Sequence, residues 1–214
     1  YDVKGLSGGH SGMDISLYRA NANKVLVRAL IPMMEKYGAK VADFKGGSLR
    51  NAIPFEAEAV VLFPEAKAAA AVRTSRKIFA TLKKKYAESD PAMAVAITKE
   101  KKAPAKYMED AVILNAFKAI AACPSNVIRM SQSMPGLTET SINLAVVRCQ
   151  NGHLTVASLM RSAIDASKAE LAQRVRYIFE MAGAKIKFVG GYSWERYIYE
   201  KMEMGSWDGN GEWT

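Results

Sequence analysis

The chain has 214 residues, of which 50% are hydrophobic and 24% are charged, and its formal net charge is +9. This composition is typical of a globular protein with one substantial core or two smaller ones. Its longest apolar runs, such as AVVLF at 59–63, are far shorter than the roughly 20 residues that cross a bilayer, so we expect no membrane span. Two cysteines and no opening signal-peptide pattern favour a cytoplasmic location.

The positive charge raises the question of a nucleic-acid partner, because clustered Lys and Arg bind phosphates. The densest clusters are KEKKAPAK at 99–106 and LKKKY at 82–86, which we predict to be a loop and a helix end. No aromatic-rich strand motif of the RNA-binding type accompanies them. We therefore expect a solvated basic surface and no nucleic-acid partner.

The first predicted helix follows the glycine-rich opening of the chain. From Ile15 to about Tyr37, apolar residues recur at three- and four-residue steps, which predicts one continuous helix. Ser11 and Asp14 are placed to cap its start, and Gly38 is placed to end it.

The remaining elements follow from periodicity and turn residues. Strands are predicted at 41–44, 55–63, 92–98, 126–133, 139–149, 153–162 and 185–189, and helices around 72–86, 107–122 and 171–182. With one further strand counted before the first helix, the first half is strand, helix, strand, strand, helix, strand, and the second is helix, three strands, helix, strand. We predict an α+β two-layer domain with a mainly antiparallel sheet of about eight strands, helices on one face and two ferredoxin-like halves.

The residues that carry metal chemistry in proteins are scarce. The chain has two histidines, His10 and His153, and no H-x-x-x-H or C-x-x-C spacing, so we expect no metal site in it. Cys149 follows an apolar alternating stretch and is expected to be inert. His10 lies within GGHSG, where glycines leave a side chain little to pack against. We therefore expect the imidazole of His10 to be exposed at a surface or in a cleft.

Five motifs occur in a consistent order: GLSGGHSGMDI, RANANK, GGSLRNAIP, ETSINLAVV and SLMRSAIDASKAEL. Together they resemble the lid, or dimerisation, domain of the aminoacyl-histidine dipeptidases, also called cytosolic non-specific dipeptidases, within a dizinc metallopeptidase family. The resemblance runs from about residue 3 to about residue 190. We therefore assign residues 1–192 to one domain and leave 193–214 as a divergent, unassigned tail.

The resemblance implies a parent enzyme that hydrolyses dipeptides of the Xaa-His type. Its two zinc ions, with their ligands, belong to a catalytic domain that this chain lacks. The chain itself would form a homodimer, close over the active site as a lid and be inactive alone. The scarcity of metal ligands and the absence of an initial Met fit an excised domain.

The resemblance also implies roles for four residues. His10 would stabilise the oxyanion of the tetrahedral intermediate, in the site of the opposite subunit, and Asn51 would contact the substrate carbonyl or carboxy terminus. Arg161 would hold a substrate carboxylate, with Arg50 as a weaker candidate for the same task. The structural alternatives are a helix-start histidine, an ordinary turn asparagine before Pro54 and a surface ion pair. A freestanding ferredoxin-like module that binds anions or nucleic acid is the alternative function.

Overall fold

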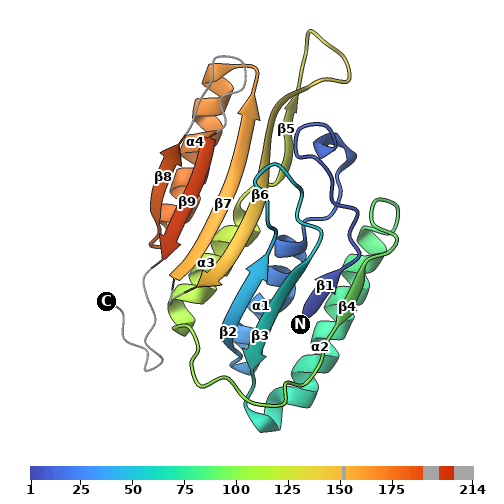
Figure 1. The fold of residues 1–214 in the computed structure, drawn as a ribbon, viewed down its shortest axis with the longest axis vertical. Helices are drawn as coiled ribbons and strands as arrows, with labels where there is room; N and C mark the ends of the chain where they lie inside the picture. Colours follow the sequence, from blue (N-terminus) through green and yellow to red (C-terminus); the bar gives the residue numbers. More distant parts are fainter. Residues whose placement is uncertain (151–152, 190–197, 205–214) are drawn as a thin grey trace.

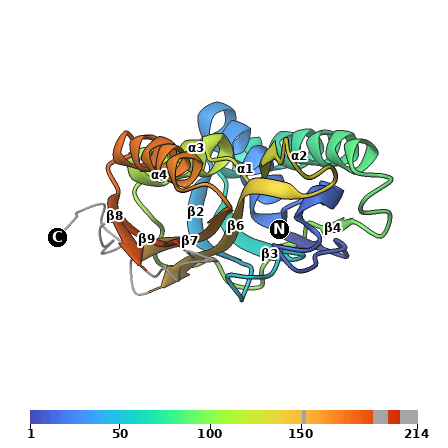
Figure 2. The ribbon, with the colours of Figure 1, turned by 90° about the horizontal axis from the view of Figure 1, so that it is seen from above.

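The computed structural model describes residues 1–150, 153–189 and 198–204. Nine strands in these residues form one antiparallel sheet, and four α-helices cover one of its faces (Figures 1 and 2). The predicted α+β two-layer architecture is confirmed.

The elements agree with the predicted order apart from an additional last strand, and they differ mainly at their ends. The strands are β1 (Asp2–Lys4), β2 (Lys40–Gly46), β3 (Ala57–Leu62), β4 (Ala94–Ala96), β5 (Asn126–Met130), β6 (Thr138–Gln150), β7 (His153–Ser162), β8 (Lys185–Val189) and β9 (Ile198–Met204). The α-helices are α1 (Ala22–Tyr37), α2 (Glu65–Lys85), α3 (Asp110–Ala122) and α4 (Asp165–Glu180), and a short 3-10 helix, η1 (Ile15–Leu17), precedes α1.

The strand order reveals two similar halves. The sheet runs β4-β1-β3-β2-β6-β7-β9-β8, with β5 paired to β6 beside this path. The first four strands, with α1 and α2, have the ferredoxin-like order. Counted outward from the junction of β2 and β6, the last four strands have the same arrangement as the first four. The difference is that β9, the last strand in the chain, stands where β1, the first strand, stands in the first half. The helices also form two pairs, since α1 contacts α2 and α3 contacts α4, and a contact between α1 and α3 joins the pairs (Figure 2).

Strand β9 lies within residues 193–214, which the sequence leaves unassigned. Its backbone pairs antiparallel with β7 on one side and with β8 on the other. The boundary at residue 192 stays a prediction.

The two halves meet along a short ladder between β2 and β6. It contains two residue pairs, which join 45–46 to 147–148. Close approach continues at Gly47, where φ is +69° and an added Cβ would lie 1.9 Å from the carbonyl oxygen of Ala145. Only glycine fits this position, since it tolerates both the left-handed backbone and the crossing chain.

Side-chain groups continue the junction where backbone pairing stops. Ser125 Oγ accepts a hydrogen bond from the Leu144 N–H (3.1 Å), and Asn21 Nδ2 donates to the Leu144 carbonyl (2.8 Å). Asn23 Nδ2 lies 3.4 Å from the Ala145 carbonyl that accepts its hydrogen bond. These contacts satisfy backbone groups of β6 that neither β2 nor β5 reaches, as buried backbone requires.

One core runs through both halves. Phe44 on β2 and Phe117 on α3 are fully buried, and their ring centroids lie 5.3 Å apart. The halves are therefore packed together as one unit and share a hydrophobic cluster.

The continuous helix predicted over 15–37 is wrong at its start. The chain forms η1, then Tyr18 adopts a left-handed backbone with φ 52°, and α1 begins only at Ala22. Asn21 caps α1, because its side chain accepts a hydrogen bond from the Lys24 N–H at 3.3 Å. The apolar spacing continued through η1 and concealed this break.

Candidate functional site

The glycine-rich loop that carries His10 lies against the loop that carries Asn51. The Ser11 N–H donates to the Asn51 carbonyl (2.8 Å), and the Ile53 N–H donates to the Gly9 carbonyl (2.8 Å). Between these bonds, His10 forms an isolated antiparallel bridge with Ala52. Two segments about forty residues apart are thus held side by side.

A buried carboxylate fixes the base of the glycine-rich loop. Asp90 is fully buried and accepts hydrogen bonds from the backbone N–H groups of Ser7 (2.8 Å) and Ala20 (2.7 Å). These bonds hold the loop at both ends, before and after His10. Asp90 lies between a predicted helix and a predicted strand, and its position in the sequence gave no sign of this role.

The imidazole of His10 is exposed but locally oriented. Its Nδ1 accepts hydrogen bonds from the N–H groups of Gly12 (3.3 Å) and Met13 (3.2 Å), while its backbone N–H donates to Asp14 Oδ2 (2.8 Å). An acceptor at Nδ1 leaves the proton of the neutral ring on Nε2. The outward nitrogen is thus a hydrogen-bond donor.

Arg161 reaches the same place from the second half. It stands near the end of β7, half-buried, and its Nη1 donates to Ser11 Oγ at 2.7 Å. An added Cβ on Gly12 would lie 3.1 Å from His10 Cε1 and 3.2 Å from Arg161 Nη1. The imidazole and the guanidinium therefore flank Gly12.

These contacts also correct the predicted helix cap. Ser11 is almost fully buried, and its hydroxyl oxygen accepts a hydrogen bond from Arg161. Asp14 accepts from the His10 N–H and lies 3.8 Å from Arg19 Nη1, so its carboxylate braces the loop. Neither side chain caps α1.

The turn that bears Arg50 and Asn51 rests on a buried asparagine. Asn143, on β6, is 1% exposed, and its Nδ2 donates to the carbonyls of Arg50 (3.1 Å) and Ala52 (2.7 Å). Both Arg50 and Asn51 have exposed side chains. Sequence analysis missed Asn143 as a positioning residue, although a polar residue within the apolar run of ETSINLAVV was an available signal.

Other candidates lie elsewhere. His153 begins β7, and Arg161 lies eight positions further along that strand, a separation of roughly 27 Å at the usual strand rise. Among the described residues, no group of three or more His, Cys, Asp or Glu side chains could hold a metal ion. His10 and Arg161, beside Gly12, thus offer hydrogen-bond donors and positive charge, which suit an anionic or carbonyl oxygen.

Within the described parts of the chain, no helix is long and apolar enough to cross a membrane.

The class of domain follows from comparison with known proteins. The family model described as the peptidase dimerisation domain matches residues 1–90. This match covers the first three of the five motifs, and together with the two relatives below it confirms the resemblance seen in them.

Two particular relatives sharpen this assignment. The cytosol non-specific dipeptidase of Escherichia coli (strain K12) is 35% identical over 196 residues, which cover 89% of this chain and 39% of that protein. The crystal structure of aminoacylhistidine dipeptidase from Vibrio alginolyticus matches with a TM-score of 0.84 and 31% identity, over 99% of this chain and 40% of that one. The chain spans about two fifths of the length of each relative. The match favours the dimerisation domain over a freestanding binding module.

Proposed function

We propose that this chain is the lid and dimerisation domain of a cytoplasmic zinc dipeptidase of the Xaa-His type, with 1–192 as the domain. The proposal is supported by similarity to two dipeptidases along nearly the whole chain. The observation that carries it is the meeting of His10 and Arg161 around Gly12. Two polar groups from different halves of a domain converge there, as a binding site requires.

The proposed roles follow from the chemistry of each group. The Nε2–H of His10 would donate to the oxygen on which negative charge develops when a peptide bond is attacked. The guanidinium of Arg161, held by Ser11, would bind the carboxylate of the dipeptide, and the Asn51 amide would donate to a substrate oxygen. Arg50, exposed on the same turn, is the second candidate for the carboxylate.

The proposed enzyme divides its work between domains. The described residues do not offer a cluster that fits zinc, so two zinc ions would be held by another part of the enzyme. His10 then acts only across an interface, which in a homodimer is most simply the site of the opposite subunit. The chain alone should hydrolyse no dipeptide after zinc is added.

The test is His10→Ala in the full-length enzyme. Loss of one oxyanion donor typically lowers kcat about 100- to 1000-fold, and zinc content should stay unchanged because His10 is no ligand. His153→Ala is the matched control, since it removes the other histidine at a distant, exposed place. Near-normal turnover in His10→Ala would refute the role.

Subunit mixing tests the opposite-subunit assignment. A heterodimer of His10→Ala with a subunit disabled only at zinc contains one site with both intact parts. Partial recovery of dipeptide turnover is expected. If the single variant is inactive and mixing restores nothing, His10 serves its own subunit.

A further inference from the structure

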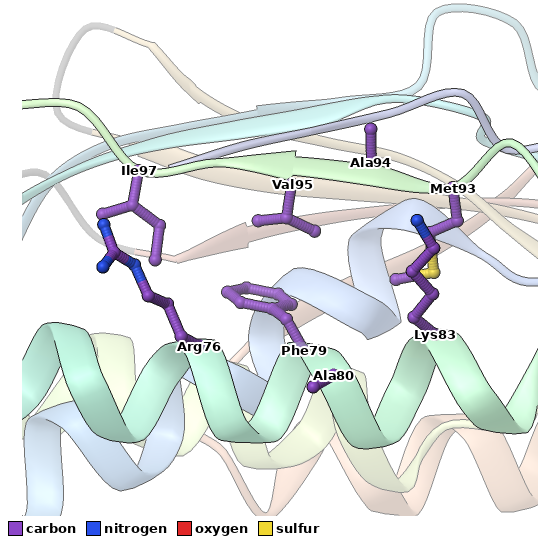
Figure 3. Close-up of a pocket in the computed structure, with 8 residues that line it drawn as sticks. All are labelled: Arg76, Phe79, Ala80, Lys83, Met93, Ala94, Val95 and Ile97. Atoms are coloured by element: carbon purple, nitrogen blue, oxygen red, sulfur yellow. The ribbon is translucent and has the colours of Figure 1, made fainter.

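A groove separates helix α2 from strand β4, and it is lined by none of the four residues to which the proposed function assigns roles. Figure 3 shows the side chains of Met93, Val95 and Ile97 on the strand side, opposite Phe79 on the helix. The cavity between them measures about 320 Å³. A neighbouring cavity of about 750 Å³ shares Arg76 and Ile97 with it, so the groove continues along α2.

The groove has an apolar middle and basic ends. Phe79 is 5% exposed and Met93 is 1% exposed, so the floor belongs to the core. Arg76 and Lys83 project from α2 on either side of Phe79 (Figure 3). Neither forms an ion pair with any residue that the structure describes. Two positive charges thus lie at an apolar surface, and no described carboxylate pairs with either of them.

The strand that borders the groove is at the edge of the sheet. Among the described strands, β4 pairs only with β1, through Ala94, Val95 and Ala96. Its other side therefore presents backbone N–H and C=O groups to an added strand. An edge strand beside a groove is the arrangement that proteins use to bind extended peptides.

We propose that the groove binds an extended acidic peptide as an additional strand on β4. One apolar side chain of the peptide lies over Phe79 and Val95, and acidic side chains two residues before and after it reach Arg76 and Lys83. The spacing fits, because the two cations lie two helical turns apart, roughly 10 Å, while positions i and i+4 of a strand are roughly 13 Å apart. Long cationic side chains span the difference.

Charge favours this occupant over a second copy. The chain carries +9, so two copies approaching through their basic grooves repel each other, whereas an acidic peptide is attracted. The proposal uses neither His10 nor Arg161 and stands apart from the proposed dipeptidase role.

The test uses a labelled nine-residue peptide with Leu at its centre, Asp two residues to each side and Thr between them, measured by fluorescence anisotropy. The double variant Arg76→Glu/Lys83→Glu should weaken binding at least about tenfold, since two ion pairs become two repulsions. Lys77→Glu/Lys84→Glu is the matched control, with the same spacing and charge change on side chains that do not line the cavity. It should change affinity less than about threefold.

Two further measurements test the strand pairing and the charge pairing separately. Peptides N-methylated at odd or at even positions should differ at least about tenfold in affinity, because only one set of N–H groups faces β4. A peptide with Asn for Asp should bind the unchanged protein as weakly as the double variant binds the original, which keeps the test valid if that variant folds poorly.

The outcomes that overturn the proposal are specific. They are no binding at 1 mM peptide, equal loss in both double variants, equal affinity of both methylated peptides, or undiminished affinity of the Asn peptide. Sedimentation without peptide adds one more: a dimer that dissociates only in Arg76→Glu/Lys83→Glu would make the groove an interface between copies.

Discussion

The two halves of the sheet share a strand order but contribute differently to the candidate site. The first half supplies loops: His10 and Asn51 lie on the two segments that pair beside β1 and β3. The second half supplies strand positions: Asn143 lies within β6 and Arg161 near the end of β7. The difference teaches that adaptable loops bear the exposed groups, whereas rigid strands of the other half set where those loops lie.

This division makes the junction between the halves decisive, and Gly47→Ala should disturb it most. The new Cβ would lie 1.9 Å from the Ala145 carbonyl, and the φ of +69° adds strain. We expect the free energy of unfolding to fall by at least about 3 kcal/mol in urea titration. Gly136→Ala is the control, because φ is +84° there but no atom lies within 4 Å of an added Cβ. It should lower the free energy of unfolding by only about 1 kcal/mol. Equal losses would show that the close approach of the halves is unimportant.

Asn143→Ala tests whether the second half supports the loop of the first. Two carbonyls in the 50–52 turn would lose their donor, and we expect a loss of about 2 kcal/mol together with faster amide hydrogen exchange at Ser11 and Ile53. Asn126→Ala is the control, because that side chain accepts a hydrogen bond from the N–H of the next residue and so acts within its own strand. Unchanged exchange at both amides would contradict the supporting role.

Ser11→Ala should have a smaller effect, confined to one contact between the halves. It removes the acceptor of the Arg161 Nη1 hydrogen bond, which is worth about 1 to 2 kcal/mol for a charged donor. A double-mutant cycle with Arg161→Ala should return most of that value as coupling. The same cycle with Ser7→Ala should return about zero, since Ser7 Oγ bonds to Ser89 within the first half. No coupling between Ser11 and Arg161 would remove the proposed positioning.

Asp43→Asn should have the smallest effect, and it should depend on pH. Partial burial raises the pKa of the Asp43 carboxyl above 3.8, against a smaller opposing effect of the Phe44 N–H. The folded state thus holds this proton more tightly than the unfolded state, and its stability falls as pH rises through the folded pKa. The variant should gain in urea midpoint above that pH and lose the gain below pH 3.8. A gain that grows on acidification would reverse the argument.

Periodicity predicted most elements because their apolar stripes are buried against a single core. The strands over 153–162 and 185–189 have the predicted bounds. β9 was missed because IYEKMEM places charged residues in both alternating sets: Glu200 in one, Lys201 and Glu203 in the other. Its pairing depends on neighbours already in place, which no local pattern records.

The candidate site could be predicted in part from the sequence motifs. GGHSG marked His10 as exposed, and the structure agrees, but the approach of Arg161 depends on Ser11 and on a junction across about 150 residues. Asp90 and Asn143 act through buried hydrogen bonds to backbone atoms, and such bonds leave little trace in residue spacing. The sequence thus indicated which side chains are exposed, and tertiary packing determines which of them lie close together.

The position of β9 has a consequence for synthesis of the chain on the ribosome. All four strands of the first half have been made once residue 96 is complete, so that half can form its sheet early. In the second half, β9 lies between β7 and β8, and among the described residues β8 is linked to the sheet only through residues 198–204. Until those residues emerge, β7 presents an unpaired edge to other nascent chains. Pairing with β9 then covers this edge of β7.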